Sequence, residues 1–420
     1  MSEELESVRG EVPGPKSRAL AEDLRNHESR GVTYVADDFP IFWESAHGAL
    51  VTDVDGNRFI DLTSAFGVAT AGHTSDAVAD AIAAQSRRLV HGLGDVHPSR
   101  VRVELLAKLA ALAPGGLEKS FLCSSGSEAV DFALKTAYLH AKRPGIVAFE
   151  GSYHGLASSA LSVTGIDRFR APFAPFVRGG VTFAAFGSLD TVEHALHEGA
   201  GTVIVEPIQG RAGVVIPPQG WLRDLRALCD SRGAVLIFDE IYTGFGRTGA
   251  MFACEHDGVV PDLLCLGKAL AGGVPLAAVI GTSEIMNAWE PSRGEALHTS
   301  TYLGNPLACA AALANLHEIE ERRIPSKAAQ LGSKLHARLE PLRALRCVAD
   351  VRGKGMLWAI ELDNAERSVA VTKEALRRGT IVLPSGVGGN CLTIAPPVTI
   401  GEGQLMRAVD LLEAAFHTVT

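Results

Sequence analysis

Three segments of the chain carry side chains that could do chemistry, and each comes directly after an apolar run typical of a buried strand. The first is residues 124–128, Ser-Ser-Gly-Ser-Glu, which follows the run 120–123. Ser125 and Glu128 have the spacing of a capping box, so a helix is expected to begin here. The unpaired N–H groups and positive dipole of a helix start attract an anion, and Gly126 would let a phosphate approach the backbone. The segment is therefore a phosphate cradle or only a capped helix start.

The second and third segments supply a carboxylate and an amine. Asp239 follows the run 234–238, at the end of a strand where open α/β sheets bind ligands, although a lone aspartate there is often only a loop cap. Lys268 follows the run 263–266 and lies among apolar and glycine residues. Burial would lower the pKa of this amine and make it nucleophilic, whereas a lysine that extends to solvent would usually have charged neighbours. Lys268 is therefore the candidate nucleophile.

Taken in this order, the three segments form the set that holds pyridoxal phosphate. They supply an anchor for the phosphate, a carboxylate for the ring nitrogen and a lysine that forms an imine with the aldehyde. A dinucleotide pattern, G-x-G-x-x-G, also occurs at residues 244–249, but five residues separate it from the strand end at Phe238 and only a short polar stretch follows. The sequence has no G-x-x-x-x-G-K-[ST] motif. The sequence therefore disfavours NAD and ATP.

The elements that must position these residues alternate along the chain. Further apolar runs predict strands, and stretches with helical spacing lie between them. The additional strands are expected at 146–149, 202–205 and 276–280, and helices at 129–141 and 222–231. Such alternation predicts an α/β fold with a mostly parallel sheet and helices on both faces.

The two ends of the chain differ from this pattern. Residues 1 to about 31 are expected to form a polar arm in which Pro13, Gly14 and Pro15 break any early helix. A long helix is expected from Leu307 through the charged run that follows it. Short strands with helices between them then predict a smaller α+β domain, with strands at 356–362, 380–383 and 391–394.

Composition narrows the choice of function and location. The 420 residues carry a net charge of −9, which disfavours nucleic acid as a partner. The N-terminus has no apolar signal region and no apolar run is long enough to span a membrane, so no membrane partner is expected. The seven cysteines form no C-x-x-C pair and suit a reducing compartment. A cytoplasmic protein is expected, and no metal site is predicted.

From about Val32 to the C-terminus the sequence resembles the class III (ω) aminotransferases, which are pyridoxal-phosphate enzymes of fold type I. Eight segments match the family's motifs in the family's order, and together they are specific although each alone is weak. They are residues 53–61, 72–73, 125–129, 153–155, 206–210, 239–249, 267–268 and 298–306. The match at 239–249, Asp-Glu-Ile-Tyr-Thr-Gly-Phe-Gly-Arg-Thr-Gly, also accounts for the apparent dinucleotide pattern.

The resemblance implies a large domain with a mostly parallel seven-stranded sheet and a smaller C-terminal α+β domain. The expected boundaries are 1–60 for an N-terminal arm and a segment that packs with the small domain, 61–310 for the cofactor-binding domain, and 311–420 for the small domain. The resemblance also implies a homodimer whose active sites are built at the subunit interface.

The resemblance assigns a role to each matching residue. Lys268 is expected to form the aldimine and then, as a free amine, to move the substrate proton, while Asp239 keeps the ring nitrogen protonated. The phosphate is expected to be held by Ser125, Gly126 and Ser127, with Thr301 reaching in from the second subunit. The ring is expected to lie between Tyr153, with His154 beside it, and Ile241, while Tyr242 lies near the phenolic oxygen and Glu206 orders the wall of the site.

Some positions of this sequence differ from the family's pattern, and these positions are expected to affect substrate binding. Members that act on ornithine or acetylornithine carry an arginine two residues before Ala-Pro-Pro, where this chain has Thr393. The same members carry a glutamate directly after Glu-Pro-Ile-Gln-Gly, where this chain has Arg211. Arg211 is therefore either a carboxylate clamp from the opposite wall or a solvent-facing side chain. Phe66, at a position that lines the substrate pocket, is expected to make that wall apolar.

The function expected from these features is ping-pong transamination between a primary amine, at a terminal carbon, and a keto acid. Two alternatives stay open. The first is a class III racemase, epimerase or aminomutase, since the cofactor motifs do not report the outcome of the reaction. The second is a cofactor-binding regulator without catalysis.

Overall fold

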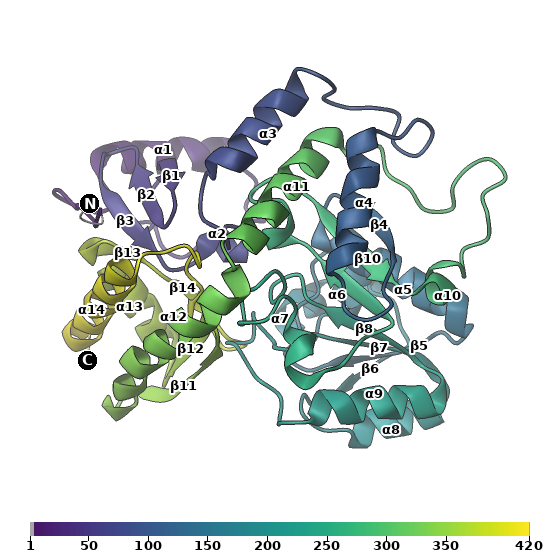
Figure 1. The fold of residues 1–420 in the computed structure, drawn as a ribbon. Helices are drawn as coiled ribbons and strands as arrows, with labels where there is room; N and C mark the ends of the chain where they lie inside the picture. The colour runs from purple at the N-terminus through teal and green to yellow at the C-terminus, as the bar shows by residue number, and fades with distance from the viewer. Residues whose placement is uncertain (1–3, 420) are drawn as a thin grey trace.

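The computed structural model describes residues 4–419, and three sheets organise the chain (Figure 1). The largest has the strand order β4-β10-β9-β8-β7-β5-β6. Its strands are β4 (Lys119–Cys123), β5 (Gly145–Phe149), β6 (Val181–Ala184), β7 (Ala200–Val205), β8 (Val235–Asp239), β9 (Leu263–Leu266) and β10 (Ala277–Gly281). Every strand runs in the same direction except β10, which is antiparallel to both of its neighbours. The predicted seven-stranded, mostly parallel sheet is confirmed.

Both faces of the large sheet are buried, as the apolar runs predict. Successive side chains of a strand point to opposite faces, so Leu236 and Phe238 belong to one buried cluster while Val235 and Ile237 belong to another. The helices on the Phe238 side are α4 (Arg100–Leu112), α8 (Asp190–His197), α9 (Trp221–Arg232) and α11 (Pro306–Glu321). Those on the Ile237 side are α5 (Gly126–Ala141), α6 (Ser158–Val163) and α10 (Ser283–Met286).

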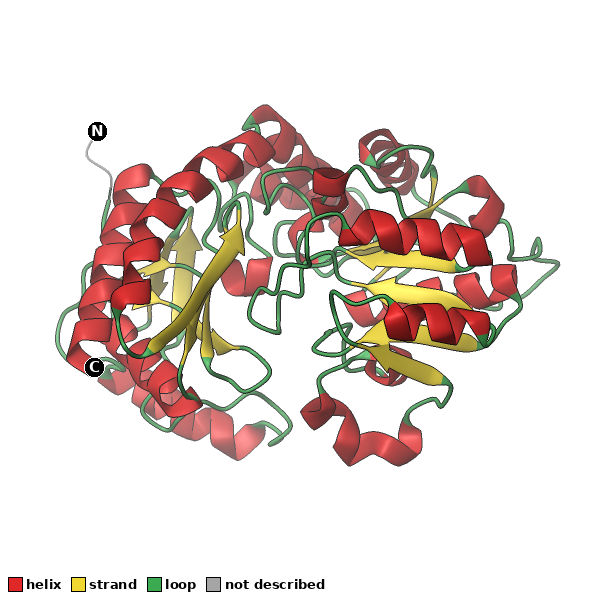
Figure 2. Cartoon of the chain, turned by 90° about the horizontal axis from the view of Figure 1, so that it is seen from below, coloured by secondary structure: helices red, strands yellow, loops and turns green. Residues whose placement is uncertain are grey.

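A second, antiparallel sheet has the order β11-β12-β15-β14. It comprises β11 (Val348–Lys354), β12 (Leu357–Leu362), β14 (Leu383–Ser385) and β15 (Cys391–Ile394), together with the helices α12 (Ile324–Leu339), α13 (Ala365–Arg378) and α14 (Glu402–Val419). Figure 2 shows the strands in two groups, each with its own helices. A smaller α+β unit is therefore present near the C-terminus, and the predicted domain boundaries themselves stay a prediction.

The third sheet joins three strands from the N-terminal part of the chain to one strand from the C-terminal part. It pairs β1 (Trp43–His47), β2 (Leu50–Asp53) and β3 (Arg58–Asp61) with β13 (Thr380–Ile381), which is parallel to β3. The predicted strand 380–383 is thus two strands in different sheets, because the chain leaves β3 after Ile381 and joins β15 from Leu383. The first and last described parts of the chain lie on the same side of the molecule (Figure 1).

The expectation of an N-terminal arm without an early helix is wrong. Helix α1 spans Pro15–His27 and has its proline at the first position, where no N–H is needed and the fixed φ suits a helix. The carboxylate of Asp55 accepts hydrogen bonds from the backbone N–H groups of Lys16 at 2.8 Å and Ser17 at 2.9 Å, which caps this helix from a distant turn.

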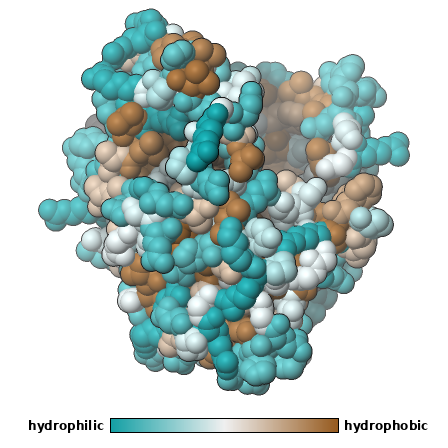
Figure 3. Space-filling view, turned by 90° about the vertical axis from the view of Figure 1, so that its right-hand side faces the viewer, coloured by the Kyte–Doolittle hydropathy of each residue, from teal (hydrophilic) through white to brown (hydrophobic). Residues whose placement is uncertain are grey.

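The remaining described elements are short, apart from one helix. They are α2 (Ser64–Gly67), α3 (Asp76–Ser86), α7 (Asp167–Arg170) and 3-10 helices at Ala171–Phe176, Ala253–Asp257, Lys268–Leu270 and Glu340–Ala344. Among residues 4–419, none of the helices combines the length and the apolar character that crossing a bilayer needs. On the face drawn in Figure 3, hydrophobic side chains form separate patches among hydrophilic ones.

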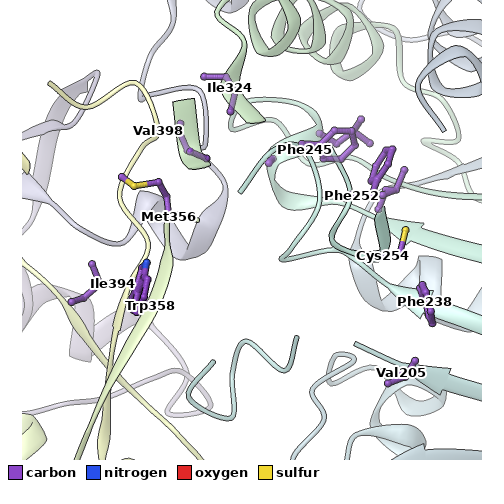
Figure 4. Packing of buried hydrophobic residues seen from close by; sticks show 14 of the residues in the cluster. Val205, Phe238, Phe245, Phe252, Cys254, Ile324, Met356, Trp358, Ile394 and Val398 are labelled. Atoms are coloured by element: carbon purple, nitrogen blue, oxygen red, sulfur yellow. The ribbon is translucent and has the colours of Figure 1, made fainter. Parts of the chain in front are cut away.

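One buried cluster contains side chains from both the large sheet and the antiparallel sheet, and Figure 4 shows some of them. Phe238 of β8 lies in it, as do Phe245 and Phe252 of the segment after β8, and Met356 and Ile394 from the C-terminal part. The segment that follows Asp239 is thus packed on both sides. Rigid packing of this kind fixes the polar groups that the segment carries.

Candidate active site

The candidate residues meet at one edge of the large sheet. The strands β4, β5, β7, β8 and β9 all point the same way, so their carboxyl ends lie along this edge, where open α/β sheets bind ligands. In the pairing of β8 with β9, Asp239 lies opposite Cys265. Lys268 follows Cys265 by three residues. The residues brought to this edge are Ser125, Gly126 and Ser127 after β4, Tyr153 and His154 after β5, Glu206 after β7, Asp239, Ile241 and Tyr242 at the end of β8, and Lys268 after β9.

The start of α5 is both capped and open to an anion. Ser125 Oγ accepts a hydrogen bond from the N–H of Glu128 at 3.3 Å, and Glu128 Oε2 accepts one from the N–H of Ser124 at 2.8 Å. Within residues 4–419 the N–H groups of Gly126 and Ser127 have no acceptor. A Cβ on Gly126 would lie 2.8 Å from Cδ1 of Ile241, so a larger residue here would have to displace the end of that side chain. Two free amides at the positive end of a helix make an anion cradle.

The carboxylate of Asp239 is held by two donors. Nδ1 of His154 lies 2.7 Å from Oδ2, and the N–H of Ile241 donates to Oδ1 at 3.1 Å. Asp239 is 4% exposed and His154 2% exposed. Nε2 of His154 is buried with no partner in the described residues. The sequence places His154 beside the cofactor ring, and the structure adds a direct bond to Asp239.

Glu206 connects two loops of the site wall. Its Oε2 accepts a hydrogen bond from the N–H of Tyr153 at 2.9 Å, and its Oε1 accepts one from the N–H of Gly210 at 3.3 Å. Burial raises the pKa of Glu206 to about 7, with Asp239 adding to the effect and His154 opposing it.

Lys268 has the environment of a nucleophilic amine. Its backbone has φ of +41°, in the left-handed region that a lysine rarely adopts. Loss of water around the amine lowers the pKa of Lys268 to about 8, although Asp239 and Glu206 oppose the shift. The amine Nζ lies 3.9 Å from the centroid of the Tyr242 ring, a contact that no sequence pattern indicated.

The backbone of Arg211 and the side chain of Thr393 bond to two adjacent residues, Gly386 and Ser385. The carbonyl of Arg211 accepts a hydrogen bond from the N–H of Gly386 at 3.1 Å, and the preceding Ser385 accepts one from Thr393 Oγ1 at 2.6 Å. Nη1 of Arg211 is buried with no acceptor in the described residues. Burial lowers the pKa of Arg211, the nearby charge of Arg168 lowers it further, and Tyr153 and Tyr242 oppose both effects. Nη1 of Arg211 is therefore shielded from solvent, although the residue as a whole is only partly buried.

Two predicted residues are exposed rather than buried with this cluster. Phe66 is 65% exposed and adopts φ of +60°. It lines an apolar cavity of about 750 Å³ together with Ile41, Trp43 and Leu383. Thr301 is exposed on the loop between α10 and α11, and no hydrogen bond of the described chain connects it to the residues above. A Cβ on Gly94, in another exposed loop, would lie 3.8 Å from the backbone oxygen of Thr301.

Arg247 is a residue of the site region to which the sequence assigned no role. It is fully buried, and its guanidinium donates to Ser64 Oγ at 3.0 Å and to Thr70 Oγ1 at 2.9 Å. It also donates to the carbonyl oxygens of Met356 and Pro396. Burial lowers the pKa of Arg247 to about 10. Arg247 thus joins the loop after β8 to segments near the N-terminus and near the C-terminus. In the sequence, only its place within the motif 239–249 could have indicated that it matters for the site.

Comparison with known proteins identifies the class. Residues 33–416 match the family model "Aminotransferase class-III". The ornithine aminotransferase of Toxoplasma gondii is 28% identical, superposes with a TM-score of 0.89, and the match covers 97% of this chain and 96% of that one. A transaminase from the marine bacterium Virgibacillus is 28% identical with a TM-score of 0.89, over 96% of this chain and 99% of that one. An amine transaminase from an uncultivated Pseudomonas species, solved in its PLP-bound form, is 29% identical with a TM-score of 0.86, over 94% and 99% of the two chains.

The fold, and the residues gathered at the carboxyl ends of the large sheet's parallel strands, therefore define a fold type I pyridoxal-phosphate transaminase. The chain belongs to the class III aminotransferase family. Transamination is the reaction of the matched proteins, and a racemase, epimerase or aminomutase outcome is not favoured.

The described residues fit pyridoxal phosphate, the cofactor of the class. The free amides of Gly126 and Ser127 suit its phosphate. Gly126 leaves a space that a Cβ would fill, and Nε2 of His154 is a buried polar atom that lacks a partner. When bound, the cofactor supplies an electron sink for the bonds that are broken at the substrate amine carbon.

Proposed function

We propose that Lys268 carries the cofactor and that its free amine moves the proton of the substrate amine carbon. Loss of water around the amine carries this assignment: it lowers the pKa of Lys268 to about 8, so about a tenth of the amine is unprotonated at pH 7 and can accept a proton, against less than about a thousandth for an ordinary lysine. We propose that Asp239 pairs with the cofactor's ring nitrogen. Its carboxylate is already oriented by His154 at 2.7 Å, so it needs no rearrangement to act.

The other contacts follow from the same edge of the sheet. Ser125, Gly126 and Ser127 hold the phosphate, supported by the two free amides at the start of α5. Tyr153 and Ile241 enclose the ring between the loops that follow β5 and β8. Glu206 keeps the Tyr153 loop in place through its 2.9 Å hydrogen bond, and the Tyr242 hydroxyl lies near the phenolic oxygen.

Arg211 binds a carboxylate of the substrate. Its Nη1 is buried and lacks an acceptor, and a guanidinium in that state is stabilised by an anion. Thr393 cannot supply a charge in its place, and its hydroxyl is already bonded to Ser385. Phe66 supplies an apolar wall beside the cavity of about 750 Å³. The substrates proposed are a primary, terminal amine as donor and a keto acid as acceptor.

The functional unit is a homodimer in which Thr301 completes the neighbouring phosphate site. Two exposed loops support this, since they contact each other and carry several large apolar side chains. Asp95 accepts a hydrogen bond from Thr299 at 2.9 Å, which ties the loops together. The exposed side chains are Leu89, Val90, Leu93 and Val96 on one loop and Leu297 and Tyr302 on the other.

A cytoplasmic location is proposed on the chemistry of the cysteines. All seven are free thiols, and all are buried. Such a set needs no oxidising compartment to fold.

The test of the proposed function is a half-reaction with the purified enzyme. The enzyme with bound cofactor is mixed with single amines that carry or lack a carboxylate, in the absence of a keto acid. Conversion of the cofactor to its pyridoxamine form, with release of one equivalent of carbonyl product, supports transamination. A racemase would return inverted amine with little conversion, and a regulator would give neither product. Either of these results contradicts the proposal.

A further inference from the structure

The ring of Tyr242 occupies a slot between two glycines. A Cβ on Gly67 would lie 2.3 Å from Cε2 of the ring, and a Cβ on Gly210 would lie 2.2 Å from Cδ1. Gly67 also has φ of +83°, a conformation that glycine adopts without strain. The two glycines come from segments far apart in the sequence, one after β3 and one after β7. Both segments thus leave the space that this ring fills.

The face of this ring is turned to the amine of Lys268. Nζ lies 3.9 Å from the ring centroid, well within the range of a cation–π contact. Within residues 4–419 no carboxylate oxygen lies within ion-pair distance of Nζ. The charged groups that face the amine are Asp239 and Glu206, which favour its protonated form, and Arg247 and Arg211, which oppose it. The ring is therefore the direct partner of the amine.

We propose that Tyr242 is a positioning residue that holds the ammonium of Lys268 over its ring face, in a place given by Gly67 and Gly210. This inference rests on the proposed role of Lys268. It assigns a task to the ring itself, apart from any contact that the hydroxyl makes with the cofactor.

A ring suits this task better than a carboxylate would. A direct ion pair with Asp239 or Glu206 would fix the amine and also hold it protonated. A cation–π contact is weaker, so it restricts the position of the amine while changing its basicity only moderately. The ring therefore holds the ammonium beside the cofactor site without preventing it from giving up its proton, and the contact ends once the amine is neutral.

The experiment varies the charge distribution of the ring and keeps its size. Phenylalanine and its mono-, di- and trifluorinated forms are placed at position 242 by suppression of a stop codon. Each enzyme is freed of its cofactor and reconstituted with pyridoxamine phosphate, so that the amine of Lys268 is free. Competitive acetylation with acetic anhydride, followed by peptide mass spectrometry, then gives the pKa of Lys268 as a function of the ring. This readout does not depend on turnover.

The pKa of Lys268 is expected to be the same in Tyr242→Phe as in the wild type. It is expected to fall stepwise with fluorination, by about half a unit to one and a half units across the series. A pKa that does not depend on fluorine content would overturn the proposal, as would a change as large in Tyr242→Phe as in the trifluorinated enzyme. The exposed Lys119, bonded to Asn287, is the internal reference, because its acetylation should not depend on the ring at position 242.

Two further variants distinguish a failure of this inference from misfolding and from a failure of the proposed function. Gly210→Ala should displace the ring and lower the pKa of Lys268 in the same direction as fluorination, in an enzyme whose unfolding temperature shows that it is folded. An unchanged pKa in a folded Gly210→Ala enzyme contradicts the role of the slot. Lys268→Met tests the underlying assignment alone: if it keeps a borohydride-reducible link to the cofactor, the proposed role of Lys268 is wrong and the inference falls with it.

Discussion

Nδ1 of His154 lies 2.7 Å from Oδ2 of Asp239, and both side chains are buried at the same edge of the large sheet. The imidazole and the N–H of Ile241 occupy one oxygen each, so the carboxylate has a single orientation. An oriented carboxylate can stabilise a protonated ring nitrogen without reorganisation in the transition state. Asp239 and His154 are thus expected to act as a unit.

Substitution of this pair is expected to slow the reaction. Asp239→Asn removes the negative charge, and its kcat/KM should fall below about a tenth of the wild-type value, a barrier increase of at least about 1.4 kcal/mol. His154→Phe keeps an aromatic ring but removes the bond to Oδ2, and it should lose less than Asp239→Asn. The double variant should be little worse than Asp239→Asn alone. Additive losses in steady-state kinetics would show that the two residues act independently.

The stability of the protein freed of cofactor should depend on pH through Lys268. The pKa of the amine is about 8 in the folded chain and 10.5 in its unperturbed state. The unfolded chain therefore binds more protons between these values, and this residue makes the folded state less stable below pH 8. Lys268→Met should then unfold at a higher temperature than the wild type at pH 7. The difference should shrink as the pH rises toward 10.5, and a difference that grew instead would contradict the burial of this amine.

Arg211→Ala is expected to affect charged substrates selectively. Loss of a charge-assisted hydrogen bond corresponds to roughly 1.5 to 3 kcal/mol, so the KM for substrates with a carboxylate should rise by about ten- to a hundredfold. Turnover of an uncharged amine should stay nearly unchanged. Arg346→Ala, at an exposed position, is the matched control for loss of positive charge. Equal losses on charged and neutral substrates would mean that Arg211 has a structural role.

Retention of the cofactor should depend on dimer formation. If Thr301 completes the site of a second copy, dilution to monomer should release pyridoxal phosphate. A charge in the exposed apolar surface, as in Val96→Asp, should do the same at higher concentration. Light scattering coupled to cofactor absorbance measures both quantities in one experiment. A monomer that keeps its cofactor would show that the second copy is not needed.

Local sequence patterns were sufficient to predict most strands of the large sheet. The buried runs before Ser124, Asp239 and Lys268 placed three strands, because a strand covered on both faces is apolar throughout. Strand β6 was missed, since this edge strand is only partly buried and has no such run. The helix at Pro15 was missed because its capping carboxylate, Asp55, comes from a distant turn.

The site likewise has residues that the sequence could predict and contacts that it could not. Residues at the ends of strands, such as Asp239 and Lys268, could be predicted, because the position follows from the strand itself. The contacts of Arg247 with Ser64 and Thr70 could not, since they join segments more than 170 residues apart. The contact between Tyr242 and Lys268 likewise depends on how β8 and β9 pair and on two remote glycines.

The central claim is that Lys268 carries the cofactor, and its most direct test is chemical. The enzyme with bound pyridoxal phosphate is reduced with borohydride and digested, and the pyridoxyl-labelled peptide is sequenced by mass spectrometry. One labelled lysine is expected, Lys268 in the segment that follows β9, and no label is expected in Lys268→Met. A pyridoxyl group found on any other lysine of the wild-type enzyme would contradict the central claim.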